Sequence, residues 1–191
     1  MATPLTSPEA AAKAPLPVVV RDRRPDDLPA LLPLLRHTHQ HEGYPVRAAA
    51  VRADWLASPD ELDAAVAVIG DRVVGHVALH RADAQHDPRA VSRWEQAVGR
   101  SSDGLAVVSR LFTDQSVRGT GTGTALLADA VLRAARLLRV AVLLVDPDSP
   151  ARGFYLRRGW QPVGTATQKW GHRTVQAVLL APPDVRVNQA S

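Results

Sequence analysis

Three glycines alternate with threonines directly behind an arginine near the middle of the chain. The stretch reads VVSRLFTDQSVRGTGTGTALL from Val107 to Leu127, and its glycines are Gly119, Gly121 and Gly123. An apolar run precedes the glycines and a helix-like run follows them. Glycines in this setting let main-chain amides approach phosphate oxygens, and a helix N-terminus attracts negative charge. The stretch therefore predicts a site for a ligand that carries phosphate.

Two nucleotide-binding designs match this loop poorly. A P-loop needs Gly-Lys-Ser/Thr at the helix start so that its lysine reaches the phosphates, and no lysine lies near Gly123. A dinucleotide fingerprint needs a third glycine three residues after the second, but Thr124 or Leu126 stands there. Asp146 ends the next predicted strand, where a ribose-binding acid belongs, and keeps a dinucleotide enzyme as an alternative.

Metal and thiol chemistry find little support in the sequence. His37 and His41 are four residues apart and would share one helix face as metal ligands, but no third ligand is evident. We therefore expect no metal. The chain has no cysteine, which excludes disulfides, thiolate metal sites and a cysteine nucleophile and is typical of a reducing cytoplasm.

Hydrophobic spacing and turn residues predict the elements that must position the loop. Strands are expected at 17–24, 64–69, 72–80, 104–113, 140–145, 160–165 and 174–181. Helices are expected from 28 to the stop signal at Gly43, and at 51–56, 88–98, 125–138 and 150–158. This order predicts one mixed α/β domain, with a sheet that has helices on its faces and one β-α-β crossover at its centre.

Several local features refine these elements. Asp26 or Asp27 is expected to cap the first helix, and Pro33 to kink or divide it. Gly70 and the aspartate after it predict a tight turn between two strands. Residues 81–104 are interpreted as an insertion whose helix begins at Pro88. No internal repeat is evident, and residues 1–17 and 182–191 are expected to form a disordered arm and a tail.

The glycine loop also contains Arg-x-x-Gly-x-Gly, formed by Arg118, Gly121 and Gly123. Here the sequence resembles the GNAT superfamily of acyl-CoA N-acyltransferases. In that family a strand and a short loop lead into Arg/Gln-x-x-Gly-x-Gly/Ala at the start of a long helix. Residues 111–127 contain each part in this order. A series of amides at a helix N-terminus beside an arginine suits the pyrophosphate of coenzyme A.

The resemblance continues downstream in VLLVDPDSPARGFYLRRGW. Ala151, Tyr155 and the pair Gly159-Trp160 fall in register with the next motif of the family. Asp148 stands where asparagine is common, and a tryptophan replaces the usual phenylalanine, so any contact made by that asparagine is in doubt. The resemblance covers about 18–181 and implies a GNAT fold with a mostly antiparallel sheet that splays apart at the cofactor site.

The resemblance also implies which residues hold acetyl-CoA. The pantetheine arm would lie along the main chain of the strand before the loop, and the pyrophosphate would take amides of the loop. The first group is Leu111, Phe112 and Thr113, and the second is Arg118, Gly119, Thr120, Gly121, Thr122, Gly123 and Thr124, with Asp148 nearby. Tyr155 would be the general acid that protonates the leaving thiolate, since a phenol held within hydrogen-bond reach can donate to it.

The general base stays open. Many family members place a glutamate early on the strand before the loop, but Val107 and Val108 stand in that region. The candidates are Glu42, His76, His80 and Asp103, with water as an alternative proton acceptor.

The resulting interpretation is an N-acetyltransferase in which a primary amine of a small molecule or peptide attacks the thioester directly. A non-catalytic GNAT module that binds an acyl-CoA as a sensor or scaffold is the alternative. Glu42 and Tyr44 are interpreted as recognising a cationic acceptor, and Trp94 with the insertion as covering it. The resemblance also favours a homodimer.

Composition sets limits on partners and compartment. The formal net charge is +4, but the arginines are scattered among acidic residues, and Lys13 and Lys169 are the only lysines. We therefore expect no nucleic-acid partner. No apolar stretch is long enough to span a membrane and no secretion signal is evident, so a cytoplasmic protein without a membrane partner is expected.

Overall fold

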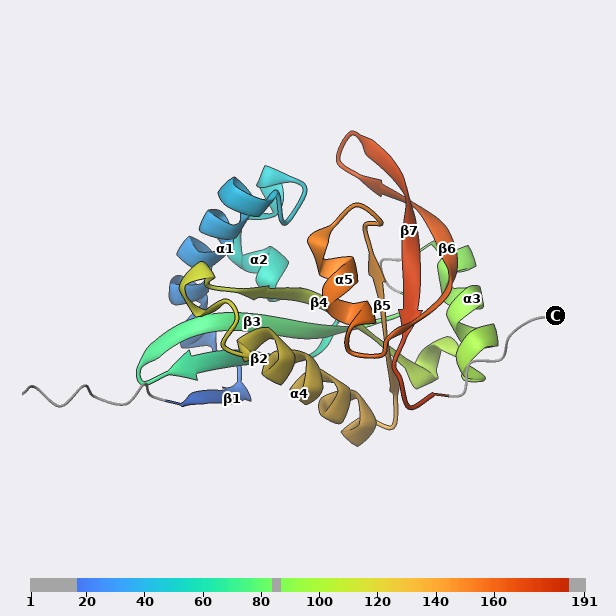
Figure 1. Cartoon of the computed structure of the whole chain (residues 1–191), viewed down its shortest axis with the longest axis horizontal. Helices are drawn as coiled ribbons and strands as arrows, with labels where there is room; N and C mark the ends of the chain where they lie inside the picture. The colour runs from blue at the N-terminus through green and yellow to red at the C-terminus, as the bar shows by residue number, and fades with distance from the viewer. Residues whose placement is uncertain (1–16, 84–86, 186–191) are drawn as a thin grey trace, which may run out of the picture.

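A computed structural model describes residues 17–83 and 87–185 (Figure 1). The strands are β1 Val18–Asp22, β2 Glu61–Ile69, β3 Arg72–Arg81, β4 Leu105–Thr113, β5 Val140–Val145, β6 Gln161–Trp170 and β7 Arg173–Ala181. The helices are α1 Leu28–Glu42, α2 Ala53–Leu56, α3 Pro88–Val98, α4 Thr122–Arg136 and α5 Pro150–Leu156. Residues 1–16, 84–86 and 186–191 of the predicted arm, insertion and tail lie outside the described residues.

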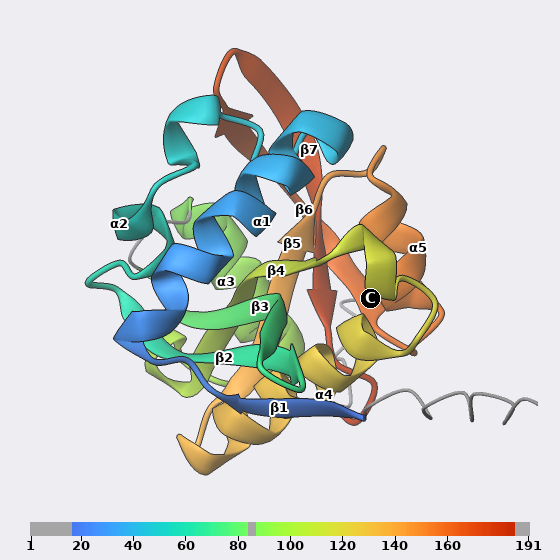
Figure 2. The ribbon, with the colours of Figure 1, turned by 90° about the vertical axis from the view of Figure 1, so that its left-hand side faces the viewer.

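The seven strands form one sheet in the order β1-β2-β3-β4-β5-β7-β6. Only β4 and β5 are parallel, because α4 crosses over between them, and the other neighbours are antiparallel. Alternate residues of β4 face opposite sides, so Ala106 and Val108 pack in the cluster that contains α4, whereas Val107 packs with α3. Helices therefore cover both faces, as predicted, with α1 on the face opposite α4 (Figure 2).

Strands β4 and β5 separate after a short paired segment. Leu105–Val107 pairs with Val140–Val142, and no pairing continues beyond it. From there β4 stays with β3, and β5 stays with β7 (Figure 1). The far half of β4 therefore has one main-chain edge that no strand occupies, and the predicted splaying of the sheet is confirmed.

Several expected boundaries and local features differ from the structure. Pro33 does not divide α1, because Leu31 and Leu35 on either side of it are fully buried and hold one helix axis. Asp27 stands at the N-cap of α1, but its carboxylate binds Arg21 and the Arg24 amide rather than capping the helix. Strand β6 continues well past 165, since the β6–β7 hairpin keeps pairing to its tip.

A β-bulge distorts β4 where the strands separate. His76 pairs with Phe112 and Ala78 pairs with Ser109, so β4 has one more residue than β3 between these pairs. Arg110 lies in the bulge with a φ of 54°, a left-handed conformation that an arginine adopts at a cost. Surrounding contacts must therefore hold the bulge in place.

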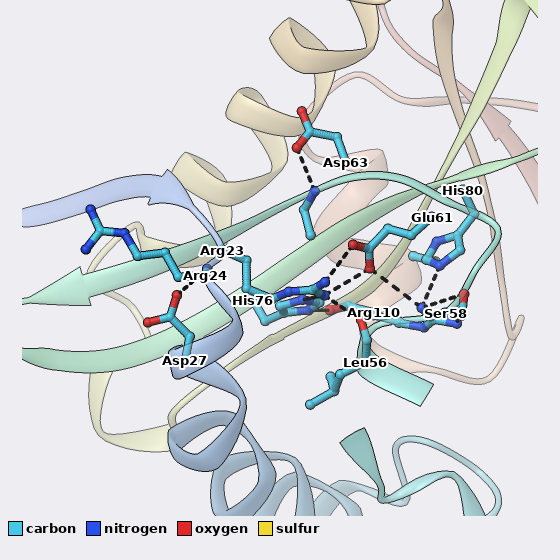
Figure 3. Close-up of polar contacts among 12 residues, drawn as sticks. Arg23, Arg24, Asp27, Leu56, Ser58, Glu61, Asp63, His76, His80 and Arg110 are labelled. Carbon is cyan, nitrogen blue, oxygen red and sulfur yellow. Dashed lines mark hydrogen bonds and ion pairs between the residues drawn. The ribbon is translucent and has the colours of Figure 1, made fainter. Parts of the chain in front are cut away.

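The side chain of Arg110 provides part of that support, as Figure 3 shows. It is only 4% exposed and donates to Ser58 Oγ at 3.3 Å and to His80 Nε2 at 2.5 Å. Because Nε2 accepts, Nδ1 of His80 carries the hydrogen and donates to Ser109 Oγ at 2.7 Å. The guanidinium also lies over the ring of Trp55, 4.9 Å from its centroid.

Glu61 neutralises only part of the charge in this region. Its carboxylate accepts two hydrogen bonds from Arg23, at 2.7 and 2.9 Å, and lies 4.0 Å from Arg110 (Figure 3). Among the side chains that contact Arg110, this is the one carboxylate within ion-pair distance in the described chain. We call Arg23, Ser58, Glu61, His76, His80, Ser109 and Arg110 the Arg110 cluster, which holds two arginines against one carboxylate.

His76 completes the support of the bulge. It is fully buried, and its Nδ1 donates to the carbonyl oxygen of Arg110 at 3.0 Å. Its Nε2 then accepts from Arg23 at 3.2 Å. Burial, together with the charges of Arg23 and Arg110, lowers the pKa of His76 to about 3, although the hydrogen bond to the carbonyl of Arg110 acts in the opposite direction. The imidazole is therefore a neutral structural link between β3 and the bulge.

We expect Glu61→Gln to destabilise the fold, because it leaves two largely buried guanidinium groups without a carboxylate. The loss in free energy of unfolding should be about 2–4 kcal/mol, measured by urea denaturation at pH 7.5. The matched control is Glu42→Gln, which removes the partner of the half-exposed Arg118. That change should cost less than about 1 kcal/mol. Equal losses for the two variants would contradict this assignment.

His76 should make stability depend on pH below neutrality. Its pKa is about 3 in the folded protein, whereas an unfolded imidazole titrates near about 6.5. At a pH above the unfolded pKa, His76 is neutral in both states and does not change the free energy of unfolding. Between the two values the unfolded chain binds a proton that the folded protein does not. The free energy of unfolding then falls by up to about 1.4 kcal/mol per pH unit as pH drops.

Urea denaturation between pH 7.5 and pH 4.5 would measure this slope. His76→Gln, which can still donate to the carbonyl of Arg110, should have a slope shallower by about one proton. The control is His37→Gln, at the exposed surface of α1. An unchanged slope in His76→Gln would show that this imidazole is protonated in the folded protein.

Candidate functional site

The predicted phosphate loop forms the N-terminus of α4. Gly119 and Gly121 adopt φ values of 78° and 88°, which only glycine reaches at little cost, and Gly121 is the N-cap. A Cβ built on either glycine would meet nothing within 4 Å, so the space above them is open. In the described structure the amides of Thr122, Gly123 and Thr124 have no protein acceptor. Free amides at the positive end of a 15-residue helix fit an anionic group.

Not every residue of the predicted loop offers its amide. The amide of Arg118 donates to Gln115 at 3.1 Å and that of Thr120 to Val117 at 3.3 Å, so these two amides shape the loop. The Thr120 hydroxyl also donates to the Val117 carbonyl at 2.7 Å. Gly119 joins the amides at the helix start as an available donor within the described chain.

Two guanidinium groups flank the helix start. Arg118 is about half exposed and forms an ion pair with Glu42 at the end of α1. Arg158 donates to the Thr124 hydroxyl through Nε at 3.0 Å and lies over the ring of Phe154, 3.7 Å from its centroid. Both cations add to the positive potential of the helix terminus, and both keep side-chain donors close to it.

The predicted pantetheine residues lie at the far end of β4. Phe112 and Thr113 pair with β3 through His76 and Gly75, and Leu111 lies in the bulge region between them and Arg110. Their other edge faces the gap between β4 and β5, where an extended ligand can lie as an added strand. Asp148 is exposed in the turn after β5, and its amide donates to Asp146 Oδ1 at 3.0 Å.

Tyr155 lies in α5 and is 8% exposed. Its ring has edge contacts with Phe154 and Trp160, at centroid distances of 5.2 and 6.0 Å. The hydroxyl has no hydrogen-bond partner among the described residues. Burial raises the pKa of Tyr155 well above its ordinary value, and the nearby phenol of Tyr44 raises it further. Tyr155 is therefore a protonated donor at physiological pH with its hydroxyl hydrogen unused.

Tyr44 connects Tyr155 to the bulge. It follows α1, and its ring meets Trp55 edge-on at 6.0 Å. Burial raises the pKa of Tyr44 to about 12, against the opposing influence of the guanidinium and main chain of Arg110. The two tyrosines thus interact electrostatically beside the part of β4 where the strands separate. No pattern in the sequence predicted that they would meet.

The four candidate bases lie in different settings. His76 and His80 belong to the Arg110 cluster, where their ring nitrogens bind protein atoms. Glu42 pairs with Arg118 beside the glycine loop. Asp103 is exposed in the turn before β4, at the end where β4 pairs with β5 rather than at the gap. The structure therefore brings none of the four next to Tyr155 as an evident base.

A hollow of about 490 Å³ lies between the segment that follows Tyr44 and the tip of the β6–β7 hairpin. We call it the loop hollow, and it is lined by Val46, Arg47, Ala48, Ala49, Trp170, Gly171, His172 and Arg173. Arg173 pairs with Asp146 at 3.3 Å, at the end of β5. Both walls therefore connect to the separated strands, one through Tyr44 and the other through Asp146.

Trp94 does not cover this region, and the expectation that it does is wrong. It is fully buried in a core cluster with Leu105, Val107, Val142 and Leu179. Helix α3 packs against β6 and β7, because its apolar side faces the sheet rather than an open cleft.

His37 and His41 stack at a centroid distance of 4.0 Å, and Nδ1 of His41 binds the carbonyl oxygen of His37. No group of three potential metal ligands is present among the described residues. Helices long and apolar enough to cross a membrane are likewise absent from the described part of the chain.

Sequence reasoning missed two residues of the site. Arg110 interrupts an apolar strand in the run LAVVSRLFT, and a charged residue in such a strand signals a buried partner. Arg158 lies in the turn after α5, three residues past Tyr155, and donates to the Thr124 hydroxyl in the first turn of α4. The spacing of Arg158 from Tyr155 was visible in the sequence, but its contact with Thr124 depends on how the two helices pack.

Comparisons with known proteins agree with this geometry. Residues 60–162, more than half of the chain, match the family model described as acetyltransferase (GNAT) domain. Among curated proteins no sequence relative is detected.

Solved structures share the fold at low sequence identity. FeeM, an N-acyl amino acid synthase from uncultured soil microbes, has a TM-score of 0.64 and 19% identity, over 87% of this chain and 90% of that one. The PaiA N-acetyltransferase from Thermoplasma acidophilum, solved with coenzyme A, has a TM-score of 0.62 and 13% identity, over 87% and 98%. A GCN5-related N-acetyltransferase from Kribbella flavida has a TM-score of 0.60 and 21% identity, over 87% of this chain and 97% of that one. With its glycine loop at a helix start beside separated strands, the chain belongs to the GNAT acetyltransferase family.

Proposed function

We propose that the protein transfers an acetyl group from acetyl-CoA to a primary amine of a small molecule or peptide. The observation that carries this proposal is the gap between β4 and β5, which has free helix-terminal amides at one end and the Tyr155 phenol beside it. A ligand with a diphosphate and an extended amide arm fits that arrangement. The coenzyme A bound to the Thermoplasma acidophilum neighbour is consistent with it.

The proposal assigns the two halves of acetyl-CoA to two parts of the site. Amides of Gly119, Gly121 and the first turn of α4 would take the pyrophosphate, with Arg118 and Arg158 at its sides. The free edge of Leu111, Phe112 and Thr113 would hydrogen-bond to the pantetheine arm. In this binding mode the thioester would lie toward the bulge at Arg110.

The chemistry then needs one proton removed and one supplied. The amine nitrogen attacks the thioester carbonyl carbon, a C–N bond forms, and the C–S bond breaks. Tyr155 would donate its hydroxyl proton to the departing thiolate, since its raised pKa keeps it protonated. The nitrogen would lose its proton to water, because no contact among the described residues places a protein base beside Tyr155.

Because no glutamate base stands on β4, one rival function also fits the site. Val107 and Val108 are buried and apolar where many family members have the acid. A module that binds acyl-CoA without turnover would have the same loop and gap but would need no acid or base.

Thiol release from acetyl-CoA with a panel of primary amines, with product masses, tests the proposal. Tyr155→Phe should lower kcat by about 10²-fold, the usual contribution of a general acid. Its dissociation constant for coenzyme A, measured by calorimetry, should change little, because the hydroxyl contacts the sulfur rather than the phosphates. Tight coenzyme A binding with no thiol release for any amine would favour the module instead.

A further inference from the structure

The loop hollow is basic and contains no acidic lining residue. Arg47, His172 and Arg173 line it, together with one aromatic residue, Trp170. The exposed Lys169 precedes this tryptophan at the tip of the same hairpin. A hollow of this size suits a small molecule, and Trp170 offers an apolar wall for its carbon skeleton.

Of the two arginines that line the loop hollow, Arg47 is the one without a carboxylate partner among the described residues. Its guanidinium forms no ion pair with any carboxylate in the part of the chain described. Its aliphatic stem lies against the hairpin tip, where a Cβ on Gly171 would come within 3.2 Å of its Cγ. Arg173 on the opposite wall is partly neutralised by Asp146 at 3.3 Å. The stem contact places Arg47 against the hairpin that carries Arg173.

Positive charge also lies near Tyr44, which precedes one lining segment of the hollow. The Arg110 cluster contains two arginines and the carboxylate of Glu61, and the charge of Asp60 also acts on Arg110. Arg110 lowers the pKa of Tyr44, and Tyr44 lies two residues before Val46, the first lining residue of the loop hollow. The lining of the loop hollow itself is therefore basic, and the nearby Glu42 is already paired with Arg118.

We propose that the acceptor is a small amine that also carries a carboxylate, bound in the loop hollow with Arg47 as its main contact. A guanidinium fork matches a carboxylate with two parallel hydrogen bonds, and Arg173 adds attraction from the opposite wall. This assignment rests on the proposed function and replaces the expectation of a cationic acceptor held by Glu42 and Tyr44.

The basic surroundings also suit an active site without a glutamate base. A nearby positive charge lowers the pKa of an ammonium group, because the charged form is disfavoured. The carboxylate anchors the acceptor, while the same cations enlarge the fraction of neutral, nucleophilic amine.

Matched acceptor pairs test the assignment. Each amino acid is compared with its own α-amide, which keeps the amine and side chain but removes the negative charge. Wild-type kcat/KM with acetyl-CoA should be higher for the acid by about fivefold or more. Arg47→Gln should remove most of this preference by raising KM for the acid, with little change for the amide. Arg47→Lys should restore part of it.

Binding provides a readout independent of turnover. With coenzyme A present, the acid should raise the melting temperature of the wild-type protein and the amide should not, and Arg47→Gln should abolish the difference. The control is Arg89→Gln, an exposed arginine on α3 outside the loop hollow, which should behave as wild type.

Equal kcat/KM for acid and amide, or an acid preference that survives in Arg47→Gln, would overturn the assignment. A peptide with an acidic side chain that outperforms every free amino acid would also overturn it. Failure of the proposed function would look different, because then no acceptor of either kind would release thiol.

Discussion

The site depends on a strand that satisfies its hydrogen bonds on one edge only. Strand β4 remains paired with β3 along its length but leaves β5 after Val107. Unpaired main-chain groups in a sheet are costly unless another partner takes them, and an open edge inside a domain indicates a ligand that does so. The bulge at Arg110 turns the strand at this point, and its left-handed conformation needs the hydrogen bond from His76.

The Arg110 cluster shows how the fold meets that cost. Side chains from β2, β3 and the segment after α2 contact the main chain or the side chain of Arg110. A buried arginine is tolerated here because a serine hydroxyl, a histidine ring nitrogen and a glutamate carboxylate surround its guanidinium. The geometry of the reacting region is thus determined by contacts on the sheet face away from α4.

Most of the architecture was predictable from the sequence because it depends on local signals. Gly70 marked the β2–β3 turn, Pro88 the start of α3, and the periodic leucines and alanines the body of α4. The loop and Tyr155 were found through motif spacing. Pro33 misled because burial of its neighbours outweighed a helix-breaking tendency. The role expected of Trp94 was wrong because the sequence of α3 does not indicate which surface of the sheet the helix covers.

Other parts of the site were not predictable, because they join residues that are far apart in the chain. Nothing local to Arg110 indicates that its partners are Ser58 and His80. The approach of Tyr44 to Tyr155 and of Arg47 to Gly171 likewise depends on how a loop and a hairpin meet over the sheet. Those contacts become visible only when the strand order is known.

The ion pair between Arg118 and Glu42 has a thermodynamic consequence for the loop. An anion that arrives at the start of α4 meets an arginine whose charge is already shared with the end of α1. Its contact with Arg118 is therefore an exchange of one anionic partner for another rather than a new attraction. The net gain is the difference between two half-exposed ion pairs, which salt screens to a similar extent. Selection for a diphosphate over smaller anions then falls to the main-chain amides, whose spacing no salt concentration alters.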